Sequence, residues 1–375
     1  MVEGRSTSAL QAQSPPRSLV VAVPELDTYQ AHTGIGRVLY GLSAYWGERV
    51  RLVHASFEAY DLPVLRNIPL RVRPPAGADL VLLPKLTGAQ ALHDTGGVPS
   101  AVIVHDIGIV DFGGDREGLG WLTYRTILQS FRALRYAAHI IAVSRFTRDR
   151  LAHYLPELGG RITVIPSGVS EVFLEYRRSP LAARQRIEAV LRHPLGSPLL
   201  VYVGSELPRK NITLLLHVFK QVKNRHPGAQ LLKVGKPGHA RWRQKTVRVV
   251  EDLGLQIGKD VQIVEDVHDL ALADAYRAAD AFVSTSLYEG FGLPALEALA
   301  VGTPVVVTNC GAFAEVVGGV GRVVAPEIAQ VVRAVDQALA DPPSEERRIQ
   351  GRARAAAFTW RRAADKYVEI LQTVQ

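Results

Sequence analysis

Cysteine is nearly missing from this sequence of 375 residues, since Cys310 is the only one. A single thiol excludes a disulfide framework and a zinc site built from cysteines, and it is typical of a reducing compartment. The sequence also lacks an apolar run long enough to span a bilayer. Residues 1–17 are polar, contain no apolar core of a signal peptide, and are expected to form a flexible tail. We therefore expect a cytoplasmic protein.

A concentrated run of basic residues is missing as well, although the formal net charge is +8. Nucleic-acid binding usually needs a basic stripe with interleaved aromatic residues, and the nearest candidate, 233–248, contains only Trp242. We therefore expect no nucleic acid among the partners. Contact with a membrane surface stays open, because a basic protein is attracted to anionic lipids.

Short apolar runs alternate with longer segments of helical spacing, which predicts an α/β fold. Two domains are expected, because single cores stop growing beyond about 250–300 residues. The predicted buried strands form two series: 18–23, 78–84, 100–106, 139–144 and 161–168, and then 198–204, 229–235, 261–265, 280–286, 303–308 and 321–326. Helical spacing is present at 36–47 and 121–137. The pattern indicates two consecutive doubly wound parallel sheets, with a linker near residues 168–197.

Ligands of doubly wound sheets bind at the carboxyl ends of the strands, so the loops there are candidate sites. The first is TGIGR at 33–37, which contains Gly34 and Gly36. It differs from a dinucleotide fingerprint, because the third glycine is missing and the loop after the first strand is long. Two interpretations stay open: amides that approach a phosphate or sugar, or only a turn and a helix start.

His105 and Asp106 stand at the end of a predicted strand. Such a pair could be a general base with its orienting acid, part of a metal site, or a polar strand end in which Asp106 caps the next turn. A metal is discounted, because no further ligands stand at metal-binding spacing. No serine lies in a nucleophile elbow.

A third loop runs from Gly204 into a helix that Asn211 could cap. Arg209 and Lys210 lie where this helix begins, and cations there oppose the helix dipole. A bound diphosphate would reverse the effect, since it gains from the helix amides and from both cations. A solvated surface pair is the alternative.

The stretch YEGFGLPALEALAVGTPVVV at 288–307 holds two acids, Glu289 and Glu297. Pro294 suits a first helical position, which predicts a short helix with Glu297 in its first turn and Leu293 at the N-cap. An acid there is favourable without any ligand, so Glu297 also has a purely structural explanation. Glu289 belongs to the preceding loop, and we expect the two acids to have different partners.

The turn between the two acids is expected to face a ligand with its backbone. Gly290 and Gly292 remove side chains on either side of Phe291, which lets amides approach a ligand closely.

The segment from Glu289 to Glu297, with seven residues between the two acids, resembles the E-x7-E motif of the retaining family 4 glycosyltransferases, which are enzymes of the GT-B fold. Other segments resemble this family in the same order: AVSRFTRD at 142–149, VIPSGV at 164–169, VGSELPRKN at 203–211, ADAFVSTS at 279–286 and FAEVVGGVGRVV at 313–324. The end, FTWRRAADKYVEIL, resembles the family's terminal helix, which crosses back onto the first domain.

The resemblance implies two Rossmann-like doubly wound parallel-sheet domains that face a cleft. The tail is then 1–17, the acceptor domain 18–170, the nucleotide-sugar donor domain 171–355, and the crossing helix 356–375.

The resemblance also implies roles. Glu297 would hold the ribose hydroxyls of the donor, and Glu289 would contact hydroxyls of the transferred sugar. Arg209 and Lys210 match a basic pair that neutralises the leaving diphosphate. The predicted catalytic residues are His105, Arg209, Lys210 and Glu289, and the predicted donor-binding residues are Gly34, Gly36, Gly204, Arg209, Lys210, Glu289, Gly290, Phe291, Gly292, Leu293 and Glu297.

The implied reaction moves a hexosyl unit from a nucleoside-diphosphate sugar to a saccharide or lipid-linked acceptor, with retention of anomeric configuration. No Asp-x-Asp metal motif is apparent, so we expect no metal or other cofactor. No nucleophile is visible, which favours same-face attack assisted by the leaving phosphate. The wording TGIGR is similar to members that assemble O-antigens and exopolysaccharides, many of which use GDP-mannose.

Two alternatives stay open: a nucleotide-sugar epimerase on the same scaffold, and a non-catalytic sugar-nucleotide binder that serves an assembly complex. The acceptor is expected on the first domain. The segment 121–139, with Arg125, Arg132 and Arg135, either contacts the inner face of a membrane or is an ordinary packing helix.

Overall fold

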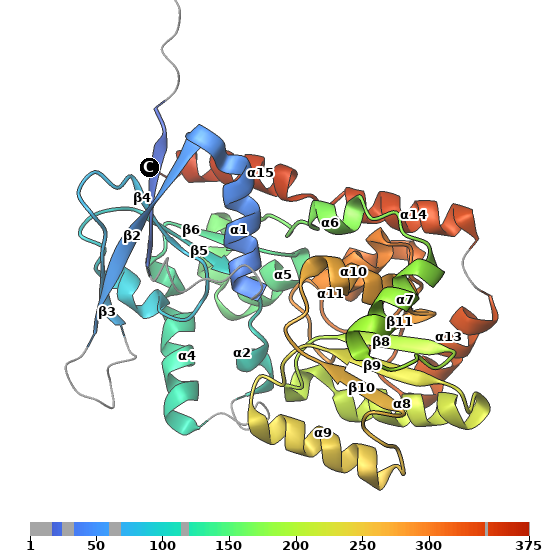
Figure 1. The fold of residues 1–375 in the computed structure, drawn as a ribbon. Coiled ribbons are helices and arrows are strands. Elements are labelled where there is room, and N and C mark those ends of the chain that lie inside the picture. Colours follow the sequence, from blue (N-terminus) through green and yellow to red (C-terminus); the bar gives the residue numbers. More distant parts are fainter. Residues whose placement is uncertain (1–16, 25–33, 60–68, 114–119, 342–343, 375) are drawn as a thin grey trace, which may run out of the picture.

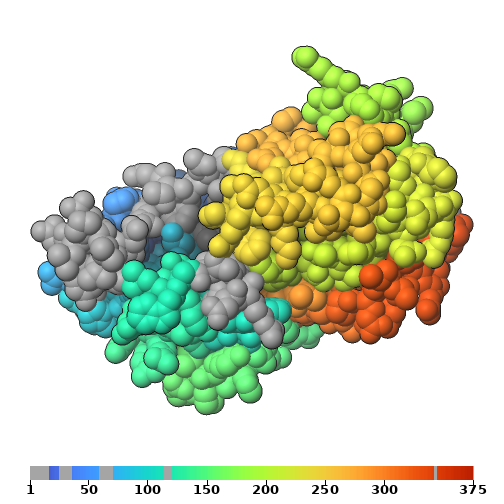
Figure 2. Space-filling view, turned by 90° about the horizontal axis from the view of Figure 1, so that it is seen from below, coloured from blue at the N-terminus to red at the C-terminus, as the bar shows by residue number. Residues whose placement is uncertain are grey.

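The computed structural model describes residues 17–24, 34–59, 69–113, 120–341 and 344–374. Their strands form two separate sheets with helices packed around them, and the two units lie side by side (Figure 1). Figure 2 shows the same division from below, with the first half of the chain in blue to green and most of the second half in yellow to red.

The first sheet has seven strands in the order β3-β2-β1-β4-β5-β6-β7. All neighbours are parallel except β2 and β3, which form an antiparallel edge. The strands are β1 (Leu19–Pro24), β2 (Val50–Ala59), β3 (Pro69–Arg73), β4 (Leu80–Leu83), β5 (Ser100–Val104), β6 (His139–Ala142) and β7 (Ile162–Val164). The helices of this half are α1 (Gly34–Trp46), α2 (Gly108–Phe112), α4 (Trp121–Ala133) and α5 (Arg145–Tyr154).

The second sheet has six strands, all parallel, in the order β10-β9-β8-β11-β12-β13. They are β8 (Leu199–Val203), β9 (Gln230–Val234), β10 (Val261–Val264), β11 (Ala281–Ser284), β12 (Val305–Thr308) and β13 (Arg322–Val324). The helices after β7 are α6 (Glu171–Leu174), α7 (Pro180–Leu191), α8 (Ile212–Arg225), α9 (Ala240–Asp252), α10 (Asp269–Ala278), α11 (Leu293–Ala300), α12 (Phe313–Val317), α13 (Ile328–Ala340), α14 (Glu345–Ala356) and α15 (Trp360–Thr373). None of the helices in the described ranges is both long enough and apolar enough to cross a membrane.

Every strand predicted from an apolar run is present, and α1 and α4 match the two segments of helical spacing. The doubly wound prediction is therefore confirmed. The predicted linker is partly helical, because α6 and α7 lie within it and α7 packs on α10. The domain boundaries themselves stay a prediction.

The edge strands β2 and β3 were not predicted. β2 carries Arg51, His54 and Glu58 among its apolar residues, which hides the pattern of a buried strand. In the hairpin the Glu58 carboxylate accepts hydrogen bonds from Arg71 and Arg73, so the charges pair across the two strands.

In both sheets the strand order reverses at a switch point, between β1 and β4 and between β8 and β11. Side chains of the central strands are almost fully buried, as in the LVLL run of β4 and the AFVS run of β11. Polar loops at the carboxyl ends of these strands are therefore the places where ligands can bind.

The last helix, α15, returns to the first half of the chain and packs beside α1 (Figure 1). Its first residue, Trp360, fits against two glycines. A Cβ added at Gly41 of α1 would lie 2.4 Å from Cδ2 of the Trp360 ring, and one added at Gly168 would lie 2.1 Å from the Trp360 nitrogen. The Val169 nitrogen also donates to the Phe358 carbonyl (2.9 Å). This hydrogen bond joins the segment after β7 to the segment before α15.

Gly41 therefore gives a test of this packing. Alanine usually stabilises a helix by about 1 kcal/mol relative to glycine. We expect Gly41→Ala to do the opposite and to lower the free energy of unfolding by about 1–3 kcal/mol, because the new methyl meets the Trp360 ring. Urea titration measures the difference. Gly351→Ala in α14 is the matched control, since its Cβ would meet its nearest atom at 3.4 Å, and a stabilised Gly41→Ala would contradict the packing.

Candidate functional site

The predicted site residues lie in two neighbouring clusters where the two halves of the chain meet. One cluster contains Arg209, Lys210 and Glu289 and faces His105 of the first half. The other contains Glu297, which faces α1. The first is called the basic cluster and the second the Glu297 cluster.

The basic cluster is built by the loop between β8 and α8. A 3-10 turn at Pro208–Lys210 is followed by Asn211, whose side chain accepts from the Leu214 nitrogen and caps α8, as predicted. Lys210 Nζ lies 2.6 Å from Glu289 Oε1, which also accepts from Ser286 (2.8 Å). Gly204, at the end of β8, has φ +151°, and a Cβ there would lie 2.7 Å from the Tyr202 hydroxyl. The positive φ and the nearby Tyr202 hydroxyl therefore exclude a side chain at Gly204.

The turn after Glu289 is pressed against the first half of the chain. A Cβ at Gly290 would lie 1.7 Å from the His105 carbonyl oxygen, so no other residue fits there. Thr147 Oγ1 donates to the Gly290 carbonyl (3.3 Å). Across the same boundary, the Arg209 guanidinium lies 3.8 Å from the Asp106 carboxylate. These contacts bring the carboxyl ends of the two sheets together at the basic cluster.

His105 is oriented by a backbone carbonyl. Its Nε2 lies 2.8 Å from the Pro84 oxygen, which can only accept, so Nε2 carries the proton. Burial lowers the pKa of His105, which keeps the ring neutral and leaves Nδ1 as an acceptor. The interpretation of Asp106 as the orienting acid is therefore wrong. Asp106 accepts from the Gly108 nitrogen (3.0 Å) and caps the next turn.

Tyr288, next to Glu289, anchors this loop. The ring is 4% exposed and packs in the core of the first half. It meets Phe112 and Phe146 edge-on, with ring centroids 5.7 and 5.1 Å apart. No role was predicted for Tyr288, because its ring belongs to the second half of the chain and packs in the first.

The helix that carries Glu297 begins one residue earlier than predicted. Gly292 is the N-cap with φ +100°, and α11 starts at Leu293 rather than at Pro294. The prediction of Leu293 as the N-cap is wrong, because the left-handed backbone of Gly292 makes the turn. Glu297 consequently lies beyond the first turn, so the helix dipole alone does not explain it. Phe291 is a core residue that packs on Phe358, with ring centroids 5.7 Å apart.

Glu297 is 3% exposed and is held from both halves of the chain. Arg37 Nη1 lies 2.7 Å from Oε1, and the Tyr276 hydroxyl donates to Oε2 (2.8 Å). Arg37 also pairs with Asp269, the first residue of α10. Burial raises the pKa of Glu297, and the Arg37 charge opposes that rise. The two acids of the motif thus have different partners, as expected.

Gly34 and Gly36 lie in the first turn of α1, and the preceding residues 25–33 are outside the described residues. Arg37 follows them in TGIGR, but its role was not predicted, because its partner Glu297 is 260 residues away. Tyr276 was not predicted either, although its partner Glu297 lies only 21 residues further along the chain.

Two cavities adjoin the clusters. One of about 430 Å³ lies between α1 and the second half, with Arg37, Tyr40, His268, Leu293 and Glu297 on its walls. Its size suits a nucleoside. A smaller one, of about 190 Å³, lies beside His105 and Arg209 and is otherwise lined mainly by residues of the first half.

Comparison with known proteins identifies two matching family descriptions. Residues 45–172 match "Glycosyltransferase Family 4", and residues 183–355 match "Glycosyl transferases group 1". The chain is 30% identical to an MMP alpha-(1->4)-mannosyltransferase of Mycolicibacterium hassiacum over 60% of its own length and 56% of that protein. It is 31% identical to the O-antigen chain mannosyltransferase B of Escherichia coli over 61% and 58% of the two lengths. The alignments thus span a little over half of these relatives.

Among solved structures, sucrose-phosphate synthase from Thermosynechococcus elongatus superimposes with a TM-score of 0.73. The sequences are 21% identical, and the match covers 95% of this chain and 98% of the other. This likeness concerns the fold, and it confirms the GT-B prediction.

The burial of Glu297 predicts a pH-dependent effect of Arg37. The raised pKa means that the folded state holds the Glu297 proton more readily than the unfolded state. This group therefore stabilises the fold at low pH, and that contribution is lost as the pH rises through the raised pKa. In Arg37→Met the pKa of Glu297 rises further, because the opposing charge is removed. We expect the free energy of unfolding to fall by about 3–5 kcal/mol at neutral pH, where the Glu297 carboxylate has lost its ion pair. The loss is smaller at acidic pH.

Urea titrations of the wild type and Arg37→Met at about pH 5 and pH 7.5 measure this difference. Arg37→Lys is the control, since it keeps the positive charge beside Glu297 and loses only the forked geometry. An equal loss for Arg37→Met at both pH values would show that packing, and not the charge, is what Arg37 supplies.

Proposed function

Because the chain belongs to the glycosyl transferases of group 1, we propose that it moves a hexosyl unit from a nucleoside-diphosphate sugar to a saccharide or lipid-linked acceptor. Such a step belongs to polysaccharide or glycoconjugate assembly. The observation that carries the proposal is the basic cluster: Arg209 and Lys210 lie at the start of α8, with Glu289 beside them and His105 opposite.

The charges of the basic cluster suit a leaving diphosphate. Breaking the anomeric bond places growing negative charge on the diphosphate, and fixed cations stabilise that charge more than the ground state. Without a donor, Lys210 Nζ lies 2.6 Å from Glu289 Oε1 and neutralises the charge of this carboxylate. With a donor bound, Lys210 and Arg209 would face the phosphates, and Glu289 would accept from hydroxyls of the sugar.

The second acid would take the other end of the donor. Glu297 lies on the wall of the cavity of about 430 Å³, together with Leu293 and His268. A ribose bound at Glu297 would place its base in this cavity. The diphosphate would then extend past the amides of Gly290 to Gly292 toward the basic cluster.

We propose retention of the anomeric configuration, by same-face attack of the acceptor hydroxyl. Two carboxylates next to the proposed reaction centre have other roles in this proposal: Glu289 accepts from the sugar hydroxyls, and Asp106 caps the turn at Gly108. The leaving phosphate would then take the acceptor proton. A trapped glycosyl-enzyme adduct would overturn this mechanism.

No metal is required by this proposal, since Arg209 and Lys210 supply the positive charge that a divalent cation would otherwise bring. The small cavity beside His105 is the proposed acceptor entrance, and His105 Nδ1 would accept from a hydroxyl there. GDP-mannose is the proposed donor, which is supported by the mannosyltransferases named among the relatives.

We also propose a cytoplasmic protein that touches the inner face of a membrane. Trp121 and Tyr136, at the ends of the α4 segment, are 69% and 55% exposed, and Arg125, Arg132 and Arg135 are exposed in the same segment. Aromatic and basic residues together suit a lipid surface. Vesicle co-sedimentation that responds neither to anionic lipid nor to salt would exclude this contact.

Donor recognition can be tested by thermal unfolding with UDP, GDP, ADP, dTDP and CDP, each with and without magnesium. We expect one nucleotide, GDP, to raise the unfolding temperature in the absence of magnesium, because a ligand at 100 times its Kd adds about 2.7 kcal/mol to stability. Stabilisation only with magnesium would contradict the metal-free proposal. Stabilisation by none would contradict the donor site.

Two variants then separate the roles of the clusters. Glu297→Gln is expected to weaken donor binding about tenfold, by weakening the bonds to the ribose hydroxyls. Arg209→Gln is expected to lower kcat about 100-fold with a smaller change in Kd, since it acts on the developing charge. Arg225→Gln, an exposed cation at the other end of α8, is the control. If an isolated donor is instead converted to another sugar nucleotide, the protein is an epimerase.

A further inference from the structure

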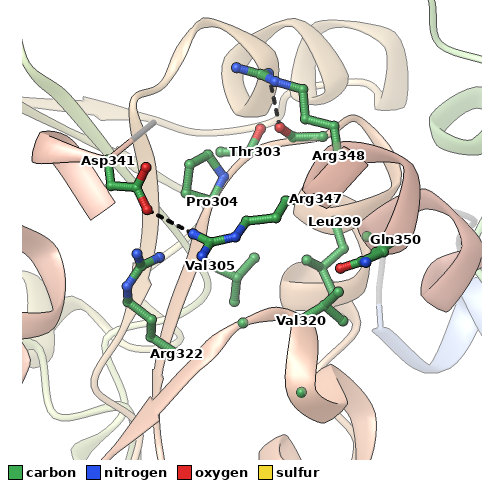
Figure 3. A pocket seen from close by; sticks show the side chains of 14 residues that line it. Leu299, Thr303, Pro304, Val305, Val320, Arg322, Asp341, Arg347, Arg348 and Gln350 are labelled. Carbon is green, nitrogen blue, oxygen red and sulfur yellow. Dashed lines mark hydrogen bonds and ion pairs between the residues drawn. The ribbon is translucent and has the colours of Figure 1, made fainter. Parts of the chain in front are cut away.

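A third pocket lies in the C-terminal half, and neither Glu289 nor Glu297 is among the residues that line it. It encloses about 290 Å³ and lies between the end of α11, the start of β12, the strand β13 and the first turns of α14 (Figure 3). It is called the arginine pocket, after Arg322, Arg347 and Arg348 on its walls.

The pocket carries an excess of positive charge. Asp341 is the only acid among its described lining residues, and its carboxylate lies 2.8 Å from Arg347 Nη1. In Figure 3 the guanidinium of Arg322 lies on the same side of the pocket as this pair, and Arg348 lies on the other side. Arg322 meets no carboxylate within the described part of the chain and bonds only to the Gln337 carbonyl, at 3.4 Å. One acid therefore faces three arginines.

Two more arginines stand behind one wall. A Cβ at Gly302 would lie 3.5 Å from Nη1 of both Arg277 and Arg352. Arg352 pairs with Glu345, whereas Arg277 bonds to a backbone carbonyl, forms no ion pair among the described residues and is influenced by Glu345 only through space. Burial lowers the pKa of Arg277, and the charges of Arg348 and Arg352 lower it further. Like charges thus crowd this wall.

Capping explains only part of this arrangement. Gly302 ends α11 with φ +82°, and its carbonyl accepts from Arg348 Nη1 (3.2 Å). A cation at a helix C-terminus is favourable, so Arg348 has a structural role. Arg322 and Arg347 do not contact these carbonyls and are spaced around an open cavity. Arginines arranged in this way select anions with several oxygens, because a guanidinium donates two parallel hydrogen bonds.

We propose that the arginine pocket binds a phosphate monoester, either of a small molecule such as a hexose phosphate or of a lipid headgroup. The volume is near the lower end of ligand sites and suits a single sugar ring with its phosphate. Pro304 and Val320 provide an apolar surface beside the arginines, against which the ring would lie. This inference does not rest on the proposed transferase activity.

Calorimetric titration of the full chain tests the pocket, with inorganic phosphate, mannose 6-phosphate and neutral mannose as probes. Because phosphate can also bind at the basic cluster, variants decide where it binds. In Arg322→Gln/Arg347→Gln the Kd for mannose 6-phosphate is expected to rise about tenfold or more. Arg248→Gln, an exposed arginine on α9, is the matched control and keeps the wild-type Kd.

Gln350→Glu adds a negative charge at an exposed position of the pocket and should also weaken binding, so it decides the matter if the double variant does not fold. Vesicles of phosphatidylcholine with or without phosphatidic acid distinguish the two sources of the phosphate. Binding only to phosphatidic acid vesicles, lost in the double variant, identifies the headgroup. No binding of any phosphate probe, or an unchanged Kd in both variants, would overturn the proposal.

Discussion

The ion pair between Arg37 and Glu297 is the constraint on which the contact between the two sheets depends. A carboxylate that is 3% exposed is costly to bury, and it is tolerated only when its oxygens are satisfied. Arg37 comes from the first half of the chain, and Tyr276 comes from the second. Glu297 is therefore satisfied only when α1 lies against α11. The fold thus fixes the position of an acid that the proposed function needs for ribose.

The same principle recurs at the other acid of the motif. Glu289 is flanked by Tyr288, which is buried among aromatic rings of the first half, and by Gly290, which lies against the His105 carbonyl. These contacts align the Glu289 loop with His105 without using the side chain of either residue. Lys210 and Ser286 then hold the Glu289 carboxylate in place. The Glu289 loop is therefore positioned by its neighbours Tyr288 and Gly290, whereas Glu297 contacts the other half of the chain with its own oxygens.

Sequence patterns predicted the parts of this structure that depend on local signals. Buried strands appear as apolar runs, and Asn211 as a cap before α8, because each is decided within a few residues. The hairpin of β2 and β3 was missed, since Arg71 and Arg73 pair with Glu58 across the strands and interrupt the apolar pattern. The start of α11 was misplaced by one residue, because the left-handed backbone at Gly292 is set by the turn. Arg37 could not be assigned, because its partner Glu297 lies on α11 in the other half of the chain.

Because Glu297 is buried in an ion pair, the proposed function must explain how a ribose could reach it. Each carboxylate oxygen has two acceptor positions, so Glu297 offers about four. Arg37 occupies one of them on Oε1, and the Tyr276 hydroxyl occupies one on Oε2. The two vicinal hydroxyls of a ribose can therefore bind to the remaining positions while both protein contacts persist. Arg37 also keeps Asp269 as a second partner, which balances its charge when Glu297 is shared. If the donor binds in this way, it adds to the contact between the two halves instead of breaking it. Glu297 would then pair with Arg37 of the first half and bind the ribose at the same time.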